Sequence, residues 1–158
     1  MNLQPFLIGD GWVEVLDGND TVRAIFDRHY SRRRYRDGRK PKLFIGPGEK
    51  LVLLSREADA ICAWRKEKHR FDSQRGVECV IFRREGGDLA SDQLRAAMGV
   101  CWQRFPCERL FSFVDPRVVP PTMVRGHPVW GFCFYKAGWR FAGLTAKGLH
   151  ILEKKVPA

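Results

Sequence analysis

The stretch that decides the fold reads Val77-Glu-Cys-Val-Ile-Phe-Arg-Arg-Glu-Gly-Gly87-Asp-Leu, continues through an amphipathic segment, and ends at Leu110-Phe-Ser-Phe-Val-Asp115. Residues 77–83 are apolar enough for a central strand, and a turn containing two glycines follows at 84–90. Apolar residues recur at helical spacing over 91–105, and Ser91 is a suitable N-cap. This order of strand, turn, helix and strand brings the free N–H groups of a helix start to the end of a buried strand, a position suited to phosphate.

The segments on either side of this stretch predict further strands and helices. Strands are expected near 12–15, 43–45, 50–55 and 60–65, and a helix capped by Thr21 or Asp20 should run into His29. Pro128 favours a helix start, that helix should end at Gly138, and apolar strands complete the chain. We therefore expect one domain over residues 1–158, of α/β or α+β class, with a mixed central sheet flanked by helices.

Composition limits the compartment and the partners. The 158 residues suit one domain, and 28 basic against 18 acidic residues give a net charge of +10, which favours a polyanion such as nucleic acid. The five cysteines include no CxxC pair, so we expect free thiols in a reducing cytoplasm. No apolar run approaches the ~20 residues of a membrane span, so a cytoplasmic protein without a membrane partner is predicted.

Most of the charge lies in one segment, Arg23 to Lys42, with nine basic and two acidic residues. Asp37-Gly38 and Pro41 indicate a loop there. The ordinary alternative is a solvated surface loop, but the surplus of seven like charges favours an anionic partner. We predict DNA contacts from this segment, made by Arg28, Ser31, Arg32, Arg33, Arg34, Arg36, Arg39 and Lys40.

The order of elements resembles the GCN5-related N-acetyltransferase fold. Residues 77–105 occupy the place of that family's pyrophosphate-binding motif, which has Gln or Arg, two residues, Gly, one residue, and Gly or Ala. Arg84 and Gly87 match it, whereas Leu89 takes the last position and Asp88 puts an acid where phosphate would lie. The resemblance implies an acetyl-CoA or related acyl donor, and we assign its binding to Arg83, Arg84, Gly86 and Gly87.

The second match to that family is its closing Tyr-x-x-x-Gly-Phe helix, which Phe134-Tyr135-Lys136-Ala137-Gly138-Trp139 resembles. In many members this tyrosine protonates the departing CoA thiolate. Tyr135 suits that role because a phenol with a pKa of ~10 stays protonated near neutral pH. An aromatic side chain packed in the core is the alternative for Tyr135.

A narrower resemblance is to the Mom family of phage DNA-modification proteins. Four segments of this chain carry it in the family's order, namely Asp27-Arg-His-Tyr-Ser-Arg-Arg33, Arg83-Arg-Glu-Gly-Gly87, Phe113-Val-Asp-Pro116 and Lys136-Ala-Gly-Trp-Arg140. The resemblance implies a transferase that adds a carbamoylmethyl (acetamido-type) group to N6 of adenine in double-stranded DNA, protecting phage DNA from restriction. It also makes iron a candidate cofactor.

The candidate catalytic residues are His29, Tyr30, Asp115 and Tyr135. His29 suits a base, a phosphate contact or a metal ligand, with a structural hydrogen bond at a helix end as the ordinary alternative. Asp115 follows a central strand, at the sheet edge where open α/β folds bind ligands, although an Asp before Pro is also a common turn former.

His29, Tyr30 and Asp115 are the candidate metal ligands, because an imidazole, a phenol oxygen and a carboxylate form an N/O site of the kind that iron accepts. N6 of adenine is hard to reach within a duplex, so we expect a flipped base stacked on Tyr30, Tyr35 or Trp64.

Two other functions stay open from the sequence. One is an acyl-CoA-dependent N-acetyltransferase acting on a small amine or a protein, which would not need the basic segment. The other is a non-catalytic DNA-binding protein, which would leave Tyr135 and the Gly-Gly turn without a role. The oligomeric state is also open, with a homodimer as one alternative.

Overall fold

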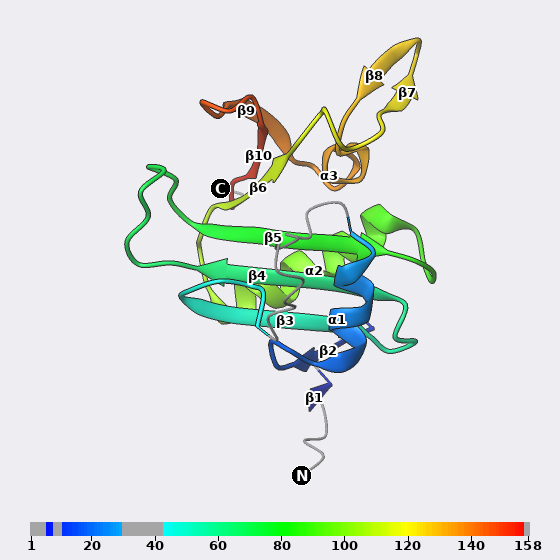
Figure 1. Cartoon of the computed structure of the whole chain (residues 1–158), viewed down its shortest axis with the longest axis vertical. Helices are drawn as coiled ribbons and strands as arrows, with labels where there is room; N and C mark the ends of the chain where they lie inside the picture. The colour runs from blue at the N-terminus through cyan, green and yellow to red at the C-terminus, as the bar shows by residue number, and fades with distance from the viewer. Residues whose placement is uncertain (1–5, 8–10, 30–42, 157–158) are drawn as a thin grey trace, which may run out of the picture.

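The computed structural model describes residues 6–7, 11–29 and 43–156 (Figure 1). Its elements are, in order, β1 (Phe6–Leu7), β2 (Trp12–Val15), α1 (Asp20–Asp27), β3 (Glu49–Ser55), β4 (Ala60–Lys66), β5 (Val77–Arg84), α2 (Ala90–Arg104), β6 (Leu110–Val114), β7 (Thr122–Val124), β8 (His127–Val129), α3 (Phe132–Lys136), β9 (Arg140–Leu144) and β10 (His150–Lys154). The predicted strand–helix–strand order over 77–114 is confirmed, with bounds that differ by one residue.

One mixed sheet dominates the described part of the chain, with strand order β1-β2-β3-β4-β5-β6-β10-β9. Neighbouring strands in it run antiparallel except for β5 and β6, which are parallel. A parallel pair needs a crossover connection, and α2 supplies it. The fold is therefore α+β, with a β5–α2–β6 unit embedded in an otherwise antiparallel sheet.

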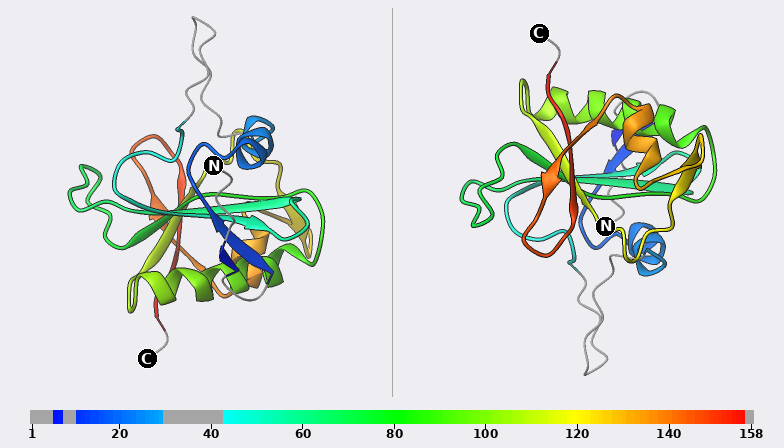
Figure 2. Two further views of the ribbon diagram at one scale, coloured as in Figure 1. Left: turned by 90° about the horizontal axis from the view of Figure 1, so that it is seen from below. Right: turned by 90° about the horizontal axis from the view of Figure 1, so that it is seen from above.

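Helices cover both faces of the sheet, as predicted. Helix α1 lies on one face, and α2 and α3 lie together on the other (Figure 2). Each face has its own core: Val22 and Ile25 of α1 pack with Ile61 and Ile81, whereas α2 packs on a larger cluster that includes Trp64.

The chain around α1 differs in detail from the prediction. Asn19 caps the helix, because its Oδ1 accepts hydrogen bonds from the backbone N–H groups of Thr21 at 3.0 Å and Val22 at 3.1 Å. Residues 43–45 form no strand. Their donors are satisfied instead by Asp17, whose carboxylate accepts from the N–H groups of Phe44 at 3.2 Å and Ile45 at 3.3 Å.

Residues 122–138 depart most from the sequence expectation, because Pro128 starts no helix. It lies in β8, which pairs with β7 in a separate two-stranded hairpin. The hairpin turn has Arg125 at φ 51° and Gly126 at φ 78°, and two positive φ angles match the twist of a tight hairpin. Helix α3 therefore begins later, after Gly131 at φ 77°.

The start of α2 also corrects the expected cap. Leu89 is the N-cap residue and has no side-chain cap, while Ser91 lies inside the helix and is buried. All five cysteines are free thiols: Cys62, Cys79 and Cys101 are buried, whereas Cys107 is exposed. Among the described residues, no helix is long and apolar enough to cross a membrane.

Candidate functional site

The parallel strands β5 and β6 form a fork. They pair only at Val77↔Leu110 and Glu78↔Phe111, and no further pair joins them in the described residues. Ser112 marks the parting point, since its Oγ donates to the Cys79 carbonyl oxygen at 2.8 Å. Beyond it, β6 turns away toward β7 while β5 continues beside β4 (Figure 1). The fork leaves strand edges without ladder partners, a place where an extended ligand can pair with backbone groups.

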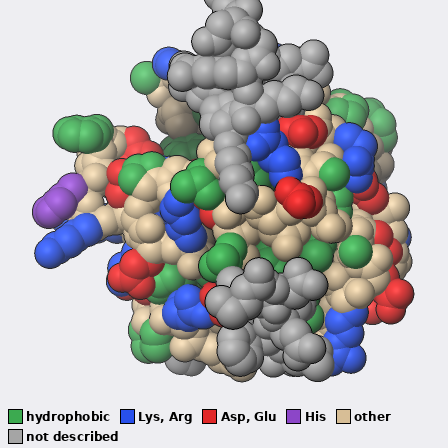
Figure 3. All heavy atoms as spheres, turned by 60° about the horizontal axis from the view of Figure 1, so that its bottom comes forward, with side chains coloured by type: hydrophobic (Ala, Val, Ile, Leu, Met, Phe, Trp, Pro, Cys, Tyr) green, Lys and Arg blue, Asp and Glu red, His purple; other side chains and the backbone are tan. Residues whose placement is uncertain are grey.

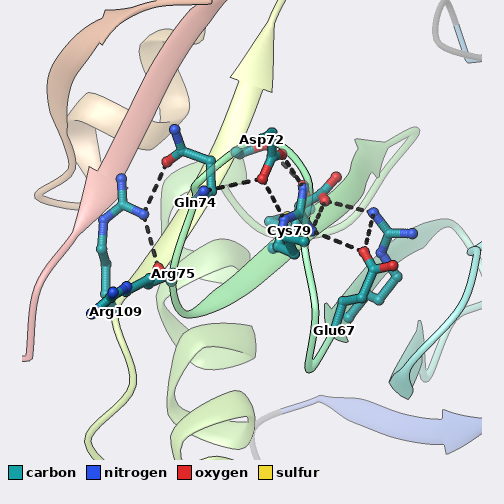
Figure 4. Close-up of polar contacts among 10 residues, drawn as sticks. Glu67, Asp72, Gln74, Arg75, Cys79 and Arg109 are labelled. Atoms are coloured by element: carbon teal, nitrogen blue, oxygen red, sulfur yellow. Dashed lines mark hydrogen bonds and ion pairs between the residues drawn. The ribbon is translucent and has the colours of Figure 1, made fainter.

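A network of ion pairs holds the closed end of the fork (Figure 4). Glu78 is buried and its Oε1 accepts from Arg65 and from Arg70, each at 2.8 Å. Arg109 donates to Glu153 at 2.8 Å and to the Arg75 carbonyl oxygen at 2.9 Å.

The guanidinium groups of Arg70 and Arg109 also lie 4.9 Å and 5.0 Å from the ring centroid of Phe111. Partly buried and mutually satisfied, these charges fix the paired end, so that the opening is confined to the other end.

A β-bulge lies where the fork opens. Trp64 pairs with Cys79 and Ala63 pairs with Ile81, so Val80 is an extra residue in β5. Bulges bend a strand and leave one residue out of the ladder, and they are frequent next to active sites. The bulge therefore adds to the parting of the strands at Val80.

A cavity of about 290 Å³ occupies the opening, and Val80, Phe113, Asp115 and Leu149 are among its lining residues. Asp115 directly follows β6, as predicted, so its carboxylate lies at the mouth of the fork. It accepts hydrogen bonds from the Arg117 backbone N–H at 3.0 Å and from Arg117 Nε at 2.9 Å. These hydrogen bonds lower the pKa of Asp115, which keeps a negative charge in the cavity.

His29 lies just beyond α1, where its backbone N–H donates to the Phe26 carbonyl oxygen at 2.8 Å. Burial, together with the positive charge of Arg83, lowers the pKa of His29 to about 4. The imidazole is therefore neutral near pH 7.

The predicted metal site finds no support in the described residues. They contain no group of three or more His, Cys, Asp or Glu side chains placed to hold a metal ion, at His29, at Asp115 or elsewhere. Tyr30, the other candidate ligand, lies outside the described residues.

Glu85 ties the end of α1 to the turn after β5. It accepts from Arg28 Nε at 2.7 Å and from Arg83 Nε at 2.9 Å, and these contacts lower the pKa of Glu85 to about 2. Arg28 and Arg83 thus share one carboxylate. The ion pair brings the first residue of the predicted DNA-binding set next to the predicted donor-binding turn.

The Gly-Gly turn in this conformation does not fit a diphosphate. Arg84 donates through Nε to the Asp88 carbonyl oxygen at 2.6 Å and through Nη2 to the Gly87 carbonyl oxygen at 3.1 Å, so its guanidinium is directed at the turn itself. The carboxylate of Asp59 lies beside both glycines, since a Cβ built at Gly86 would be 2.7 Å from Asp59 Oδ2. A diphosphate would meet that carboxylate and would have to displace Arg84.

Tyr135 lies in α3 and lines a different cavity from Asp115. Burial raises the pKa of Tyr135, so the phenol stays protonated near neutral pH. The structure thus preserves the protonation state that a proton donor needs, but the two predicted catalytic residues do not share one cavity.

Several predicted residues lie outside the described part of the chain, so their roles stay predictions. They are Tyr30, Ser31, Arg32, Arg33, Arg34, Arg36, Arg39 and Lys40, together with the stacking candidate Tyr35. The other stacking candidate, Trp64, is 0% exposed within the core, where it packs on Trp139 at a ring distance of 6.3 Å, so it cannot stack on a base.

Sequence reasoning missed a second basic region, in the C-terminal part of the chain. No acidic residue occurs between Asp115 and Glu153, whereas five basic residues do: Arg117, Arg125, Lys136, Arg140 and Lys147. The signal was a lack of acids rather than a cluster of arginines.

Comparisons with family models, with characterised proteins and with solved structures give no match to this chain.

Proposed function

We propose that this chain is a DNA-modifying transferase, similar to the Mom family, that adds a carbamoylmethyl group to N6 of adenine and so protects phage DNA from restriction. The observation that carries the proposal is the fork between β5 and β6, with the Asp115 carboxylate in its cavity. We also infer a GCN5-related N-acetyltransferase-like fold, supported by the parallel β5–β6 pair and its crossover helix α2. A cytoplasmic location follows from the proposal, in the host cell if a phage encodes the chain.

The fork suits a donor that carries an amide. Its parted strands offer backbone donors and acceptors, so a carbamoylmethyl donor can lie along β5 in the manner of an added strand. Because the turn at Arg84 does not fit a diphosphate, we expect the donor to bind in the fork rather than on the turn.

The acceptor must be positioned and must lose a proton. The lone pair of N6 is delocalised into the purine ring, so N6 is a poor nucleophile and has to be held rigidly against the donor carbon. As the N6–C bond forms, the bond from that carbon to the leaving group breaks, and the leaving group takes the electron pair. The proton that N6 loses passes to the neutral imidazole of His29, while the Asp115 carboxylate accepts a hydrogen bond from the N6 amine and orients it.

Charge supports DNA as the acceptor molecule. A net charge of +10 favours a polyanion, and two regions carry the surplus of positive charge: residues 23–42 with nine basic and two acidic residues, and residues 116–152 with five basic and no acidic residues. A small amine would need neither region.

Expression of the chain with plasmid DNA, followed by digestion to nucleosides and mass measurement, tests the proposal. We expect a deoxyadenosine whose mass has increased by one carbamoylmethyl group in place of hydrogen. His29→Ala and Asp115→Asn should abolish it while the protein stays folded. The matched controls His69→Ala and Asp20→Asn change exposed residues and should keep it. Unmodified deoxyadenosine under good expression would refute the proposal.

The alternative is an acyl-CoA-dependent N-acetyltransferase, which the same fork favours because it accepts an acyl arm whatever the acceptor. Calorimetric titration with acetyl-CoA separates the two. Tight binding, with acetylation of a small amine and no change in DNA, would support the alternative. DNA binding without transfer of any group would support the remaining alternative, a non-catalytic DNA-binding protein.

A further inference from the structure

A second cavity, of about 340 Å³, lies among β8, α3, β9 and β10, away from the fork. Five of its lining residues have aromatic rings: Trp130, Phe132, Tyr135, Phe141 and His150. Two ring pairs are edge-on: His150 lies 5.6 Å from Trp130 at 78° and 5.4 Å from Phe141 at 80°. A site built this way offers ring faces and edges to a flat ligand.

The cavity is open to an incoming ligand. Phe141 is 49% exposed although it packs on His150, so one wall of the cavity faces solvent. A ring that entered would cover this exposed aromatic surface, and burial of that surface favours binding.

One polar group in the wall has no partner. Trp130 Nε1–H is buried and finds no acceptor among the described residues. An indole N–H normally has a partner when buried, and leaving it without one is costly. A ligand ring with an acceptor nitrogen or oxygen would accept the hydrogen bond that Trp130 Nε1–H does not make with any described residue.

The surroundings select for an anionic ligand. Between Asp115 and Glu153 there are five basic residues and no acid. Arg117 is paired with Asp115, and Arg140 with Glu153. Arg125, Lys136 and Lys147 have no carboxylate partner in the described part of the chain, and Arg125 belongs to the hairpin whose Val124 and Pro128 line the cavity. Flat rings attached to negative charges are the chemistry of a nucleic acid strand.

We propose that this cavity holds one unstacked nucleobase of the DNA strand, with Arg125, Lys136 and Lys147 near its phosphates. The inference rests on the proposed function and adds a base-holding site apart from the reaction cavity. Leu149 lines the fork cavity and its neighbour His150 lines this one, so the two cavities flank the start of β10. The base held here is therefore a neighbour of the modified adenine, and the cavity contributes to the choice of flanking sequence.

The site is tested by changing two things in turn, the bases of the DNA strand and the aromatic side chains of the cavity. The probes are two fluorescently labelled single strands of equal length and charge, one with bases and one abasic, and the anisotropy of each reports affinity at fixed salt. Wild type should bind the abasic strand about tenfold more weakly, which is the scale of losing one base–aromatic stack. Phe141→Ala and Phe132→Ala should weaken binding of the strand with bases by a similar factor and leave binding of the abasic strand unchanged.

Phe71→Ala is the matched control, because Phe71 is an equally large aromatic that is fully exposed in the loop between β4 and β5. Figure 3 shows hydrophobic, histidine and basic side chains at the left edge of the molecule, the side on which that loop lies in Figure 1. We expect this variant to bind both strands as wild type does.

The outcomes separate this inference from the proposed function. If Phe141→Ala and Phe132→Ala bind the strand with bases as tightly as wild type does, the cavity does not hold a base, even if plasmid adenine is modified. A base-dependent loss in both variants would support it, even if no modified adenine is found. Sedimentation measures the oligomeric state and so tests whether a second copy of the chain occupies the cavity. A wild-type dimer that is lost in Phe141→Ala would assign the cavity to that second copy and overturn the inference.

Discussion

Ser112 Oγ donates a hydrogen bond to the Cys79 carbonyl oxygen at 2.8 Å, at the point where β5 and β6 part. The Ser112 side chain of β6 thus donates the hydrogen bond to β5 that a backbone N–H of β6 would donate if the ladder continued. Ser112 is buried at 6% exposure, so the hydrogen bond is shielded from water. The fork therefore has a defined end, held by Ser112 and by the ion pairs around Glu78.

Replacement of Ser112 by alanine should lower the free energy of unfolding by about 1–3 kcal/mol, because the Cys79 carbonyl oxygen would lose a buried donor. Urea denaturation measures the change. Ser73→Ala is the control, since Ser73 is exposed, and it should leave stability unchanged within about 0.5 kcal/mol. Equal stability of the two variants would show that the Ser112 hydrogen bond contributes nothing.

The pKa of His29 predicts how stability depends on pH. It is about 4 in the folded chain against an ordinary 6.5, so the unfolded chain takes up a proton first as the pH falls. The contribution of His29 is therefore full above about 6.5 and is lost as the pH falls to about 4. Denaturation across this window should show a weaker pH dependence for His29→Gln than for wild type. The same change in the exposed His69 should leave the wild-type dependence, and a wild-type profile for His29→Gln would refute the assignment.

Arg83 is the second cause of the low His29 pKa, so Arg83→Gln should raise it. The value should stay below 6.5, because burial is the larger cause and is not removed. An NMR titration of the His29 ring protons gives the pKa directly. Arg84→Gln removes an equal charge one residue later in β5 and should shift it less, since Arg83 is the charge that lowers the pKa of His29. An unchanged pKa in Arg83→Gln would mean that burial alone sets the value.

The elements that could be predicted from the sequence were those with strong local signals. The apolar runs at 77–83 and 110–114 are buried strands, and the periodic segment between them is a helix. Asp115 was placed correctly at a strand end because Asp-Pro both stops a strand and begins a turn. Local sequence pattern was sufficient to predict an element wherever its type and its ends depend on its own residues alone.

The fork could not be predicted, because it depends on what lies between strands. Each strand reads as buried, but no pattern within 77–83 or 110–114 says that the two pair at their first residues and then part. The β7–β8 hairpin was missed for a related reason. Its turn places Arg125, a residue with a Cβ, at φ 51°, which sequence rules reserve mainly for glycine and asparagine.

The basic segment predicts a salt-dependent affinity for DNA. Joint replacement of Arg32, Arg33 and Arg34 by glutamine should weaken binding and make log K fall less steeply with log salt, by about 0.9 for each phosphate that is no longer neutralised. A binding titration at several salt concentrations measures the slope. The control replaces Arg56, Lys68 and Arg75, three exposed basic residues outside both basic regions, and should change the slope less. Equal slopes in the two triple variants would assign the effect to net charge alone.

Two glycines give opposite predictions for the same substitution. Gly76 has φ 116°, and a Cβ there would lie 2.0 Å from the Arg109 carbonyl oxygen, at the first residues of the β5–β6 pair. Gly76→Ala should therefore destabilise the chain by more than about 2 kcal/mol, from backbone strain and from that close approach. Gly99 is an exposed residue of α2, and a Cβ there would meet nothing within 4 Å. Gly99→Ala should stabilise by about 0.5–1 kcal/mol, because alanine is the better helix former. Thermal unfolding of both variants measures the difference, and a Gly76→Ala protein as stable as wild type would refute the close packing at the closed end of the fork.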